Sequence, residues 1–259
     1  DSAIFYEQSN IKKSILFGRD ALKKAHHIKN DSLIAKSKIL LASQYIKISS
    51  YNKALIYLQD AIEYFRKTNN RKEDILLRKK IGDLLWYTGK FKDALVYYQE
   101  FANYSLQNND TLSYVRSHIA KGAVYGNINR LDTAITIFKD ALKLAQSIDN
   151  KYLENLCKFN IGDALLFSNK PHQAILIFNE LLNDVKKNNQ PYSNYAGLYS
   201  SLASAHVKIN QPEIAKEYNK IAFEYAKKDS LLNEINEYYD LEFQIDTSLK
   251  NYKNALFNH

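Results

Sequence analysis

Apolar residues recur along the chain at the three- and four-residue spacing of amphipathic helices, and short polar breaks separate the segments. Residues 71–110 illustrate the pattern with two apolar stripes. The first stripe consists of Ile75, Leu76, Ile81, Leu84, Leu85 and Trp86, and the second, after a break at Thr88–Lys90, consists of Phe91, Ala94, Leu95, Tyr98 and Phe101. No alternation typical of strands extends over comparable lengths, so the pattern predicts an all-α protein.

A repeat of 40 residues organises these helices. Small residues mark its register, because antiparallel helices approach closely only where side chains are small, and we expect Gly or Ala of each first helix to face Ala of the second. The marks on the second helices are Ala54, Ala94, Ala134, Ala174, Ala215 and Ala255, and those on the first helices, twelve residues earlier, are Ala42, Gly82, Gly122, Gly162 and Ala203.

Polar residues at the same period predict where the helices begin and end. Asn and Asp side chains cap the free N–H groups of a helix start. The predicted caps are Asn30, Asn70, Asp110, Asn150 and Gln190, and the predicted breaks within the units are Ser49–Ser50, Thr88–Lys90, Asn129–Arg130, Ser168–Lys170 and Asn210–Gln211. Pro171 and Pro212 stand in the first turn of second helices, where a missing N–H costs little.

The repeat predicts one continuous solenoid, residues 1–259, without a domain boundary. Its expected units are 1–30 (partial), 31–70, 71–110, 111–150, 151–190, 191–229 and 230–259 (partial). In the first partial unit we expect a second helix over residues 9–29, preceded by a remnant of a first helix over Ser2–Gln8. At the other end, Leu231–Thr247 begins a sixth unit that breaks off, so we expect either that the chain is part of a longer protein or that its ends pack on something else.

Composition agrees with long helices and short connections, since 259 residues include only 7 Gly and 3 Pro. The net charge of +8 comes with lysines spread along the whole chain, which is typical of a solvated surface. No apolar stretch is long enough to predict a membrane span. The single cysteine, Cys157, lies beside Leu156 on an apolar helix and is interpreted as a packing residue.

The pattern resembles the tetratricopeptide repeat family, whose motif has W-x2-L-G-x2-Y followed by A-x3-F. The matching residues are Gly122, Tyr125, Ala134, Phe138 and Ala141 in one unit, Ile161, Gly162, Leu165, Ala174 and Phe178 in the next, and Leu41, Ala42, Tyr45, Ala54, Leu58 and Ala61 in the first full unit. HEAT and armadillo repeats have a similar length but lack this Gly/Ala register.

The chain departs from the family pattern in two ways. Its period is 40 instead of about 34 residues. The position of the opening Trp holds Lys38, Arg78, His118, Lys158 and Tyr199, of which only the last is aromatic. The long period looks like that of repeats in bacterial signalling and transcription-regulatory proteins, including peptide-sensing regulators and sensor kinases.

The resemblance implies a right-handed superhelix of about six helix pairs, with the first helices lining a concave groove. Its cations, amides and aromatic rings suit an extended peptide, although these side chains could equally be ordinary solvated residues. The candidate groove residues are Lys36, Lys47, Lys79, Asp83, Trp86, Tyr87, Arg116, Asn127, Asn160, Asp163, Phe167, Ser204 and Lys208. Trp86 would be an anchor if it is exposed and a core residue if it is buried.

The sequence contains no pattern typical of a catalytic or metal-binding site. His26 and His27 are adjacent and point to different sides of a helix, whereas metal pairs prefer the spacing of one turn. The phosphate-binding motif G-x-x-x-x-G-K-[ST] and the nucleophile motif G-x-S-x-G do not occur. We therefore expect no catalytic residue, no metal and no cofactor.

Two binding functions are compatible with the sequence. We favour a protein- or peptide-binding module that forms the sensor or scaffold region of a bacterial signalling or transcription-regulatory protein. The alternative is a single-stranded nucleic-acid-binding repeat protein, which would use tyrosines such as Tyr97, Tyr98, Tyr218, Tyr238 and Tyr239 as a stacking platform. At helical spacing these rings more often pack between helices, so nucleic acid is the weaker hypothesis.

Overall fold

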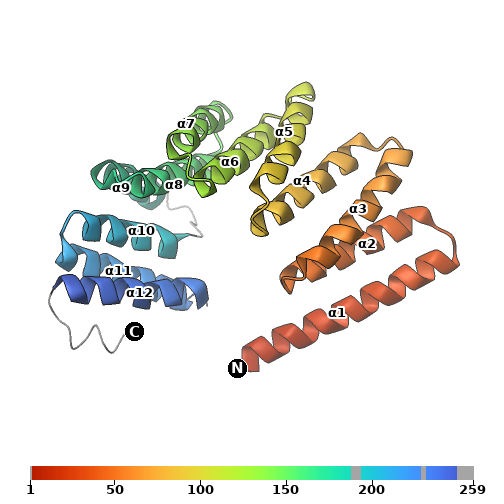
Figure 1. Ribbon diagram of the computed structural model, residues 1–259, viewed down its shortest axis with the longest axis horizontal. Coiled ribbons are helices and arrows are strands. Elements are labelled where there is room, and N and C mark those ends of the chain that lie inside the picture. The colour runs from red at the N-terminus through yellow and green to blue at the C-terminus, as the bar shows by residue number, and fades with distance from the viewer. Residues whose placement is uncertain (1, 188–193, 229–231, 250–259) are drawn as a thin grey trace. The chain divides into compact units, whose positions relative to one another are not determined.

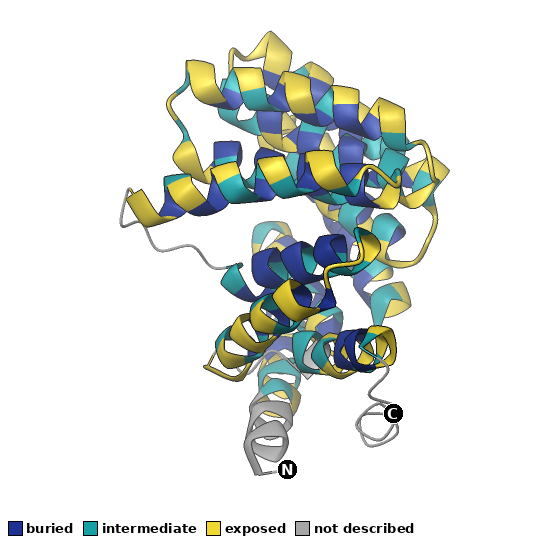
Figure 2. Ribbon diagram, turned by 90° about the vertical axis from the view of Figure 1, so that its left-hand side faces the viewer, coloured by how far each residue is buried: buried dark blue, intermediate teal, exposed yellow. Residues whose placement is uncertain are grey.

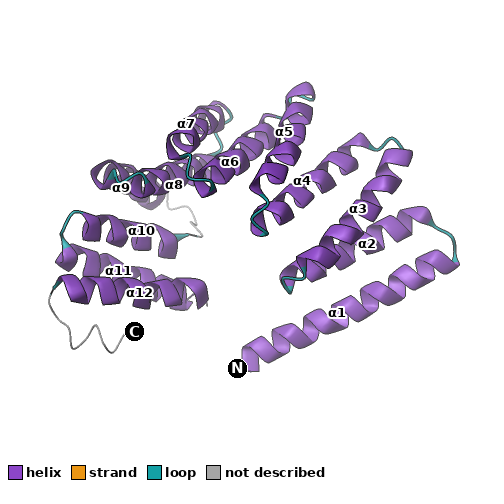
Figure 3. Ribbon diagram, viewed as in Figure 1, coloured by secondary structure: helices purple, strands orange, loops and turns teal. Residues whose placement is uncertain are grey.

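Helices account for all the regular structure in residues 2–187, 194–228 and 232–249, which are the residues described by the computed structural model (Figure 3). They are labelled in Figure 1. The helices are α1 (Ser2–His27), α2 (Asp31–Lys47), α3 (Tyr51–Lys67), α4 (Arg71–Tyr87), α5 (Phe91–Gln107), α6 (Thr111–Asn127), α7 (Leu131–Ser147), α8 (Lys151–Phe167), α9 (Pro171–Lys187), α10 (Tyr195–Lys208), α11 (Pro212–Lys228) and α12 (Leu232–Ser248). The all-α prediction is confirmed.

The chain forms two compact units, Asp1–Ser117 and His118–His259, and the boundary between them falls within α6. In the first unit each helix from α1 to α5 packs on the next one along the chain. In the second unit the same holds from α7 to α12, and α10 also contacts α8 and α12. The expected break after Gln8 is wrong, because α1 is one uninterrupted helix of 26 residues. The division into 40-residue units stays a prediction.

Side-chain caps and left-handed residues set the helix ends at the predicted positions. The N–H groups of Leu33, Glu73, Ser113 and Leu153 donate to the side chains of Asn30, Asn70, Asp110 and Asn150, respectively, at 3.0–3.3 Å. The predicted cap Gln190 lies outside the described residues. Each predicted internal break contains a residue with positive φ, namely Ser49, Gly89, Asn129, Asn169 or Asn210. A residue in this left-handed conformation ends the helix, and the backbone N–H groups at the turn donate to the last carbonyls of the helix.

The glycines Gly82, Gly122 and Gly162 of the first helices lie against large side chains of the second helices, whereas Ala203 shares a buried cluster with Ala215. A Cβ placed on Gly162 would lie 2.3 Å from the Phe178 ring, and one on Gly122 would lie 2.5 Å from the Phe138 ring. Phe178 is fully buried. The expectation that each glycine faces an alanine is therefore wrong, because the absent side chain makes room for an aromatic ring. Alternating buried and exposed positions along the helices are visible in Figure 2.

Ion pairs occupy the position where the family motif has its Trp. Lys38 pairs with Asp60 at 2.7 Å, Arg78 with Glu100 at 2.9 Å, and Lys158 with Glu180 at 2.6 Å. Each pair joins a first helix to the second helix of the same predicted unit, always 22 residues further on. The three cations thus join the two helices of a pair at the position where the family motif has a large apolar side chain.

The glycine contact predicts opposite effects for two Gly→Ala substitutions. Gly162→Ala removes the space for the buried Phe178 ring, so we expect it to lower the free energy of unfolding by roughly 2 kcal/mol. Gly126→Ala is the matched control, because nothing lies within 4 Å of its added Cβ. Since alanine is the better helix former, this control should be neutral or stabilising by up to about 1 kcal/mol. Urea unfolding measures both changes, and equal effects of the two substitutions would contradict the contact.

Candidate functional site

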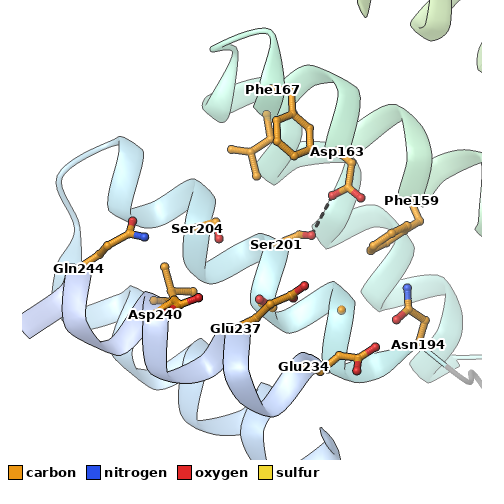
Figure 4. Close-up of a pocket in the computed structure, with 14 residues that line it drawn as sticks. Phe159, Asp163, Phe167, Asn194, Ser201, Ser204, Glu234, Glu237, Asp240 and Gln244 are labelled. Carbon is orange, nitrogen blue, oxygen red and sulfur yellow. Dashed lines mark hydrogen bonds between the residues drawn. The ribbon is translucent and has the colours of Figure 1, made fainter. Parts of the chain in front are cut away.

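A pocket of about 520 Å³ lies in the second unit between α8, α10 and α12 (Figure 4). Helix α8 contributes an aromatic and acidic wall, α10 contributes serines, and α12 contributes a row of polar side chains. Its lining consists of Phe159, Asp163, Leu166, Phe167, Asn194, Gly197, Ser200, Ser201, Ser204, Glu234, Glu237, Asp240, Leu241 and Gln244. The contacts of α10 with both α8 and α12 hold the three walls together.

Asp163 is the central titratable residue of this pocket. Its Oδ1 accepts a hydrogen bond from the Ser201 hydroxyl at 2.8 Å. The pKa of Asp163 is raised to about 7, because burial outweighs the lowering effect of the Ser201 hydrogen bond and the charge of Glu237 adds to the rise. Burial, together with Glu234 and Asp240, also raises the pKa of Glu237. The pocket therefore concentrates negative charge in a place that is partly withdrawn from water.

The sequence predicted three residues of this pocket and missed its α12 wall. Asp163, Phe167 and Ser204 are candidate groove residues that the structure brings together. The acidic row was missed because the last unit was interpreted as a repeat that breaks off. A signal was present: Glu234, Glu237, Asp240 and Gln244 recur at three- and four-residue spacing, which places them on one face of a helix.

The side chains of the other candidates in the second unit donate hydrogen bonds to backbone carbonyls, either of their own helix or near the end of a neighbouring helix. The side-chain amides of Asn127 and Asn160 donate to the carbonyls of Ala123 and Leu156 on the preceding turn. Lys208 donates to the Leu166 carbonyl at 3.2 Å, near the end of α8. These three residues do not line the pocket, and their groove role stays a prediction.

The candidates of the first unit are spread over α2, α4 and α6. Lys36, Lys47 and Arg116 are exposed. Lys79 pairs with Asp83 at 2.8 Å, and Asp83 also accepts from the Tyr98 hydroxyl.

Trp86 is partly buried, with its indole nitrogen shielded and without a hydrogen-bond partner among the described residues. It packs edge-on against Tyr87, whose side chain is exposed and stacks on Tyr51. Trp86 is thus neither a fully buried core residue nor a free anchor. A smaller pocket of about 330 Å³ in the same unit is lined by Ser49, Ser50, Tyr51, Asn52, Lys53 and Thr88.

Several tyrosines of the suggested stacking platform pack inside the protein. Tyr98 is buried, and the Tyr238 ring lies 4.1 Å from the Phe223 ring. Tyr218 contacts the rings of Tyr199 and His206. These aromatic faces are occupied by intramolecular contacts.

Cys157 is buried as predicted, and burial raises the pKa of its thiol to about 12. Within residues 2–187, 194–228 and 232–249, no group of three or more His, Cys, Asp or Glu side chains could hold a metal ion. None of the helices in these ranges is long and apolar enough to cross a membrane.

Comparison with known proteins supports the interpretation of the repeat. Residues 115–148 match the family model described as tetratricopeptide repeat. No curated protein matches the chain in sequence. Solved structures with this fold include aspartyl phosphate phosphatase F from Bacillus subtilis, with a TM-score of 0.74 and 15% identity over 88% of this chain and 60% of that one.

Two further similar structures contain peptides. The Rap conjugation gene regulator of the plasmid pLS20, in complex with the Phr* peptide, has a TM-score of 0.69 and 15% identity over 83% of this chain and 59% of that one. NprR, in complex with its cognate peptide NprX, has a TM-score of 0.68 and 15% identity over 94% of this chain and 70% of that one. The fold of this chain is thus that of the tetratricopeptide-type helical repeats.

The raised pKa of Asp163 predicts a stability change that depends on pH. Its folded pKa of about 7 lies above the ordinary value of 3.8, so the ionised carboxylate costs stability as pH rises between these values. Asp163→Asn removes this cost and can keep the contact with Ser201. We expect the free energy of unfolding to rise by roughly 2 kcal/mol at about pH 8 and to change little at about pH 4.

Urea unfolding at the two pH values measures this difference. Glu224→Gln, at an exposed position of α11, is the control for removing one negative charge. The electrostatic description of the pocket is wrong if Asp163→Asn shifts stability equally at both pH values or destabilises the protein at the higher one.

Proposed function

We propose that this tetratricopeptide-type repeat protein is a peptide-binding regulatory module whose pocket between α8, α10 and α12 receives part of an extended peptide. The observation that carries the proposal is the pocket itself. Its volume of about 520 Å³ lies within the range of about 300–1,000 Å³ that is typical of ligand sites. Two of the similar structures contain bound peptides, which supports the same kind of ligand.

The lining suits a peptide because it combines aromatic surface with hydrogen-bonding groups. Phe159 and Phe167 offer aromatic surface, and the Phe167 side chain is 72% exposed. Ser200, Ser204 and Asn194 add hydroxyl and amide groups that can bind the polar backbone of an extended chain. An exposed aromatic ring at the rim of a pocket is a typical anchor for a partner.

We further propose that the module regulates through binding and not through catalysis, as the sensor or scaffold region of a bacterial signalling or transcription-regulatory protein. One similar structure is named a phosphatase. The residues that line the pocket in the described part of this chain nevertheless include no His, Cys, Lys or Arg. Ser201 donates to Asp163, a carboxylate, without an imidazole that could act as general base between them.

Peptide selection tests the function directly. Short random peptides displayed on phage should yield binders, and fluorescence polarisation measures the affinity of a selected synthetic peptide. Phe167→Ala removes the aromatic anchor and should weaken binding roughly tenfold or more. Leu176→Ala is the matched control, because Leu176 is 70% exposed but lies on α9 outside the pocket. It should leave the affinity unchanged.

Two outcomes would contradict this function. The first is that selection yields no binder to the folded protein. The second is that selected peptides lose affinity with Leu176→Ala but not with Phe167→Ala, which would show that peptides bind to the second helices and not to the pocket.

A further inference from the structure

Asp163, on the α8 wall of the pocket, lacks the cationic partner that buried carboxylates have elsewhere in the described part of this protein. Asp74 pairs with Arg78 at 3.0 Å, Glu154 with Lys151 at 2.9 Å, and Asp246 with Lys216 at 2.8 Å. All three carboxylates are buried. Pairing compensates the free energy of removing a charge from water, so these three sites are what an ordinary folded interior requires.

Asp163, which is largely withdrawn from water, departs from this pattern. The carboxylates that line the pocket from α12 are more accessible: Glu234 is half-buried, and Glu237 and Asp240 are exposed. Asp163, Glu234, Glu237 and Asp240 form no salt bridge with any residue in the described ranges, although the chain carries a net charge of +8. Asp163 has a neutral partner, the Ser201 hydroxyl. In Figure 4 the α12 carboxylates lie across the pocket from Asp163 and the two phenylalanines. The described residues thus place carboxylates on two walls of the pocket and no cation in its lining.

We propose that the pocket receives a lysine or arginine side chain of the bound peptide. This inference rests on the proposed function and names the chemistry that selects the peptide. A cation between α8 and α12 would lie near Asp163 on one side and Glu237 on the other. Phe159 and Phe167 give the same cation an aromatic wall, and aromatic faces attract guanidinium and ammonium groups.

Two other occupants fit the pocket less well. The four carboxylates do not form a group that could hold a metal ion. Nucleic acid presents phosphates, which the same carboxylates repel, and base stacking needs free aromatic faces next to basic residues. A basic peptide side chain satisfies both the charge and the aromatic surface.

Binding of a cation in the pocket is coupled to the loss of a proton from Asp163. Asp163 faces Ser201 of α10 and Glu237 of α12, and Glu234 and Asp240 stand beside Glu237 on the same helix. Because the pKa of Asp163 lies at about 7, this carboxyl is partly protonated at neutral pH. A cation favours the ionised form, so its affinity should rise as pH increases through 7.

The test compares four mixtures of short synthetic peptides that differ in one fixed central residue, namely Arg, Lys, Gln or Glu. Fluorescence polarisation measures their binding to the wild-type chain and to the double variant Glu237→Gln/Asp240→Asn. We expect the Arg and Lys mixtures to bind the wild type roughly tenfold more tightly than the Gln mixture, and the double variant to lose this preference. The preference should also be larger at about pH 8 than at about pH 6.

The control is Glu213→Gln/Glu224→Gln, which removes two exposed negative charges from α11 and leaves the pocket intact. If this variant loses the preference to the same extent, general charge attraction explains the binding and the inference is overturned. Equal binding of all four mixtures would overturn the inference while leaving the proposed function in place. Binding of none of them would overturn both.

Discussion

The structure depends on the contact between a residue without a side chain and an aromatic ring. Gly122 against Phe138 and Gly162 against Phe178 bring the first and second helix of a pair closer than a Cβ would allow. Because the ring fills the space left by the glycine, the contact fixes both the distance and the axial register of the pair. In the second unit, faces of the first helices α8, α10 and α12 form the pocket.

The pocket illustrates why net charge says little about a binding site. The chain is basic, but the cations at the position where the family motif has Trp form salt bridges within helix pairs, as Lys158 does with Glu180. Asp163 lies in the same helix as Lys158 but has only a hydroxyl for a partner. An uncompensated carboxylate at this position lowers stability, and proteins retain such groups where binding requires them.

Much of the fold could be predicted from the sequence because it is local. Asn30, Asn70, Asp110 and Asn150 cap helices through bonds that span three residues, and Pro171 and Pro212 begin helices because proline has no N–H to lose. The partner of each glycine could not be predicted correctly, because the side chain that lies against it belongs to another helix. The continuity of α1 was missed because weak similarity to the repeat suggested a break where the helical pattern has none.

The site was predictable only where it follows the repeat register. Asp163, Phe167 and Ser204 were found because each occupies an equivalent position on a first helix. Lys79 and Asp83 occupy such positions too, but they neutralise each other one turn apart. Glu234 and Glu237 escaped prediction because charged residues on a helix are usually solvated, and only the position of α12 relative to α8 shows that they face a cavity.

The most direct measurement is the titration of the Asp163 carboxyl carbon by ¹³C NMR, with and without a saturating arginine-containing peptide. A carboxylate held in this pocket without a cation should titrate near pH 7, and the peptide should move its midpoint downward by supplying the missing positive charge. A midpoint near the ordinary value of 3.8 in the free protein, or one that the peptide leaves unchanged, would contradict the account.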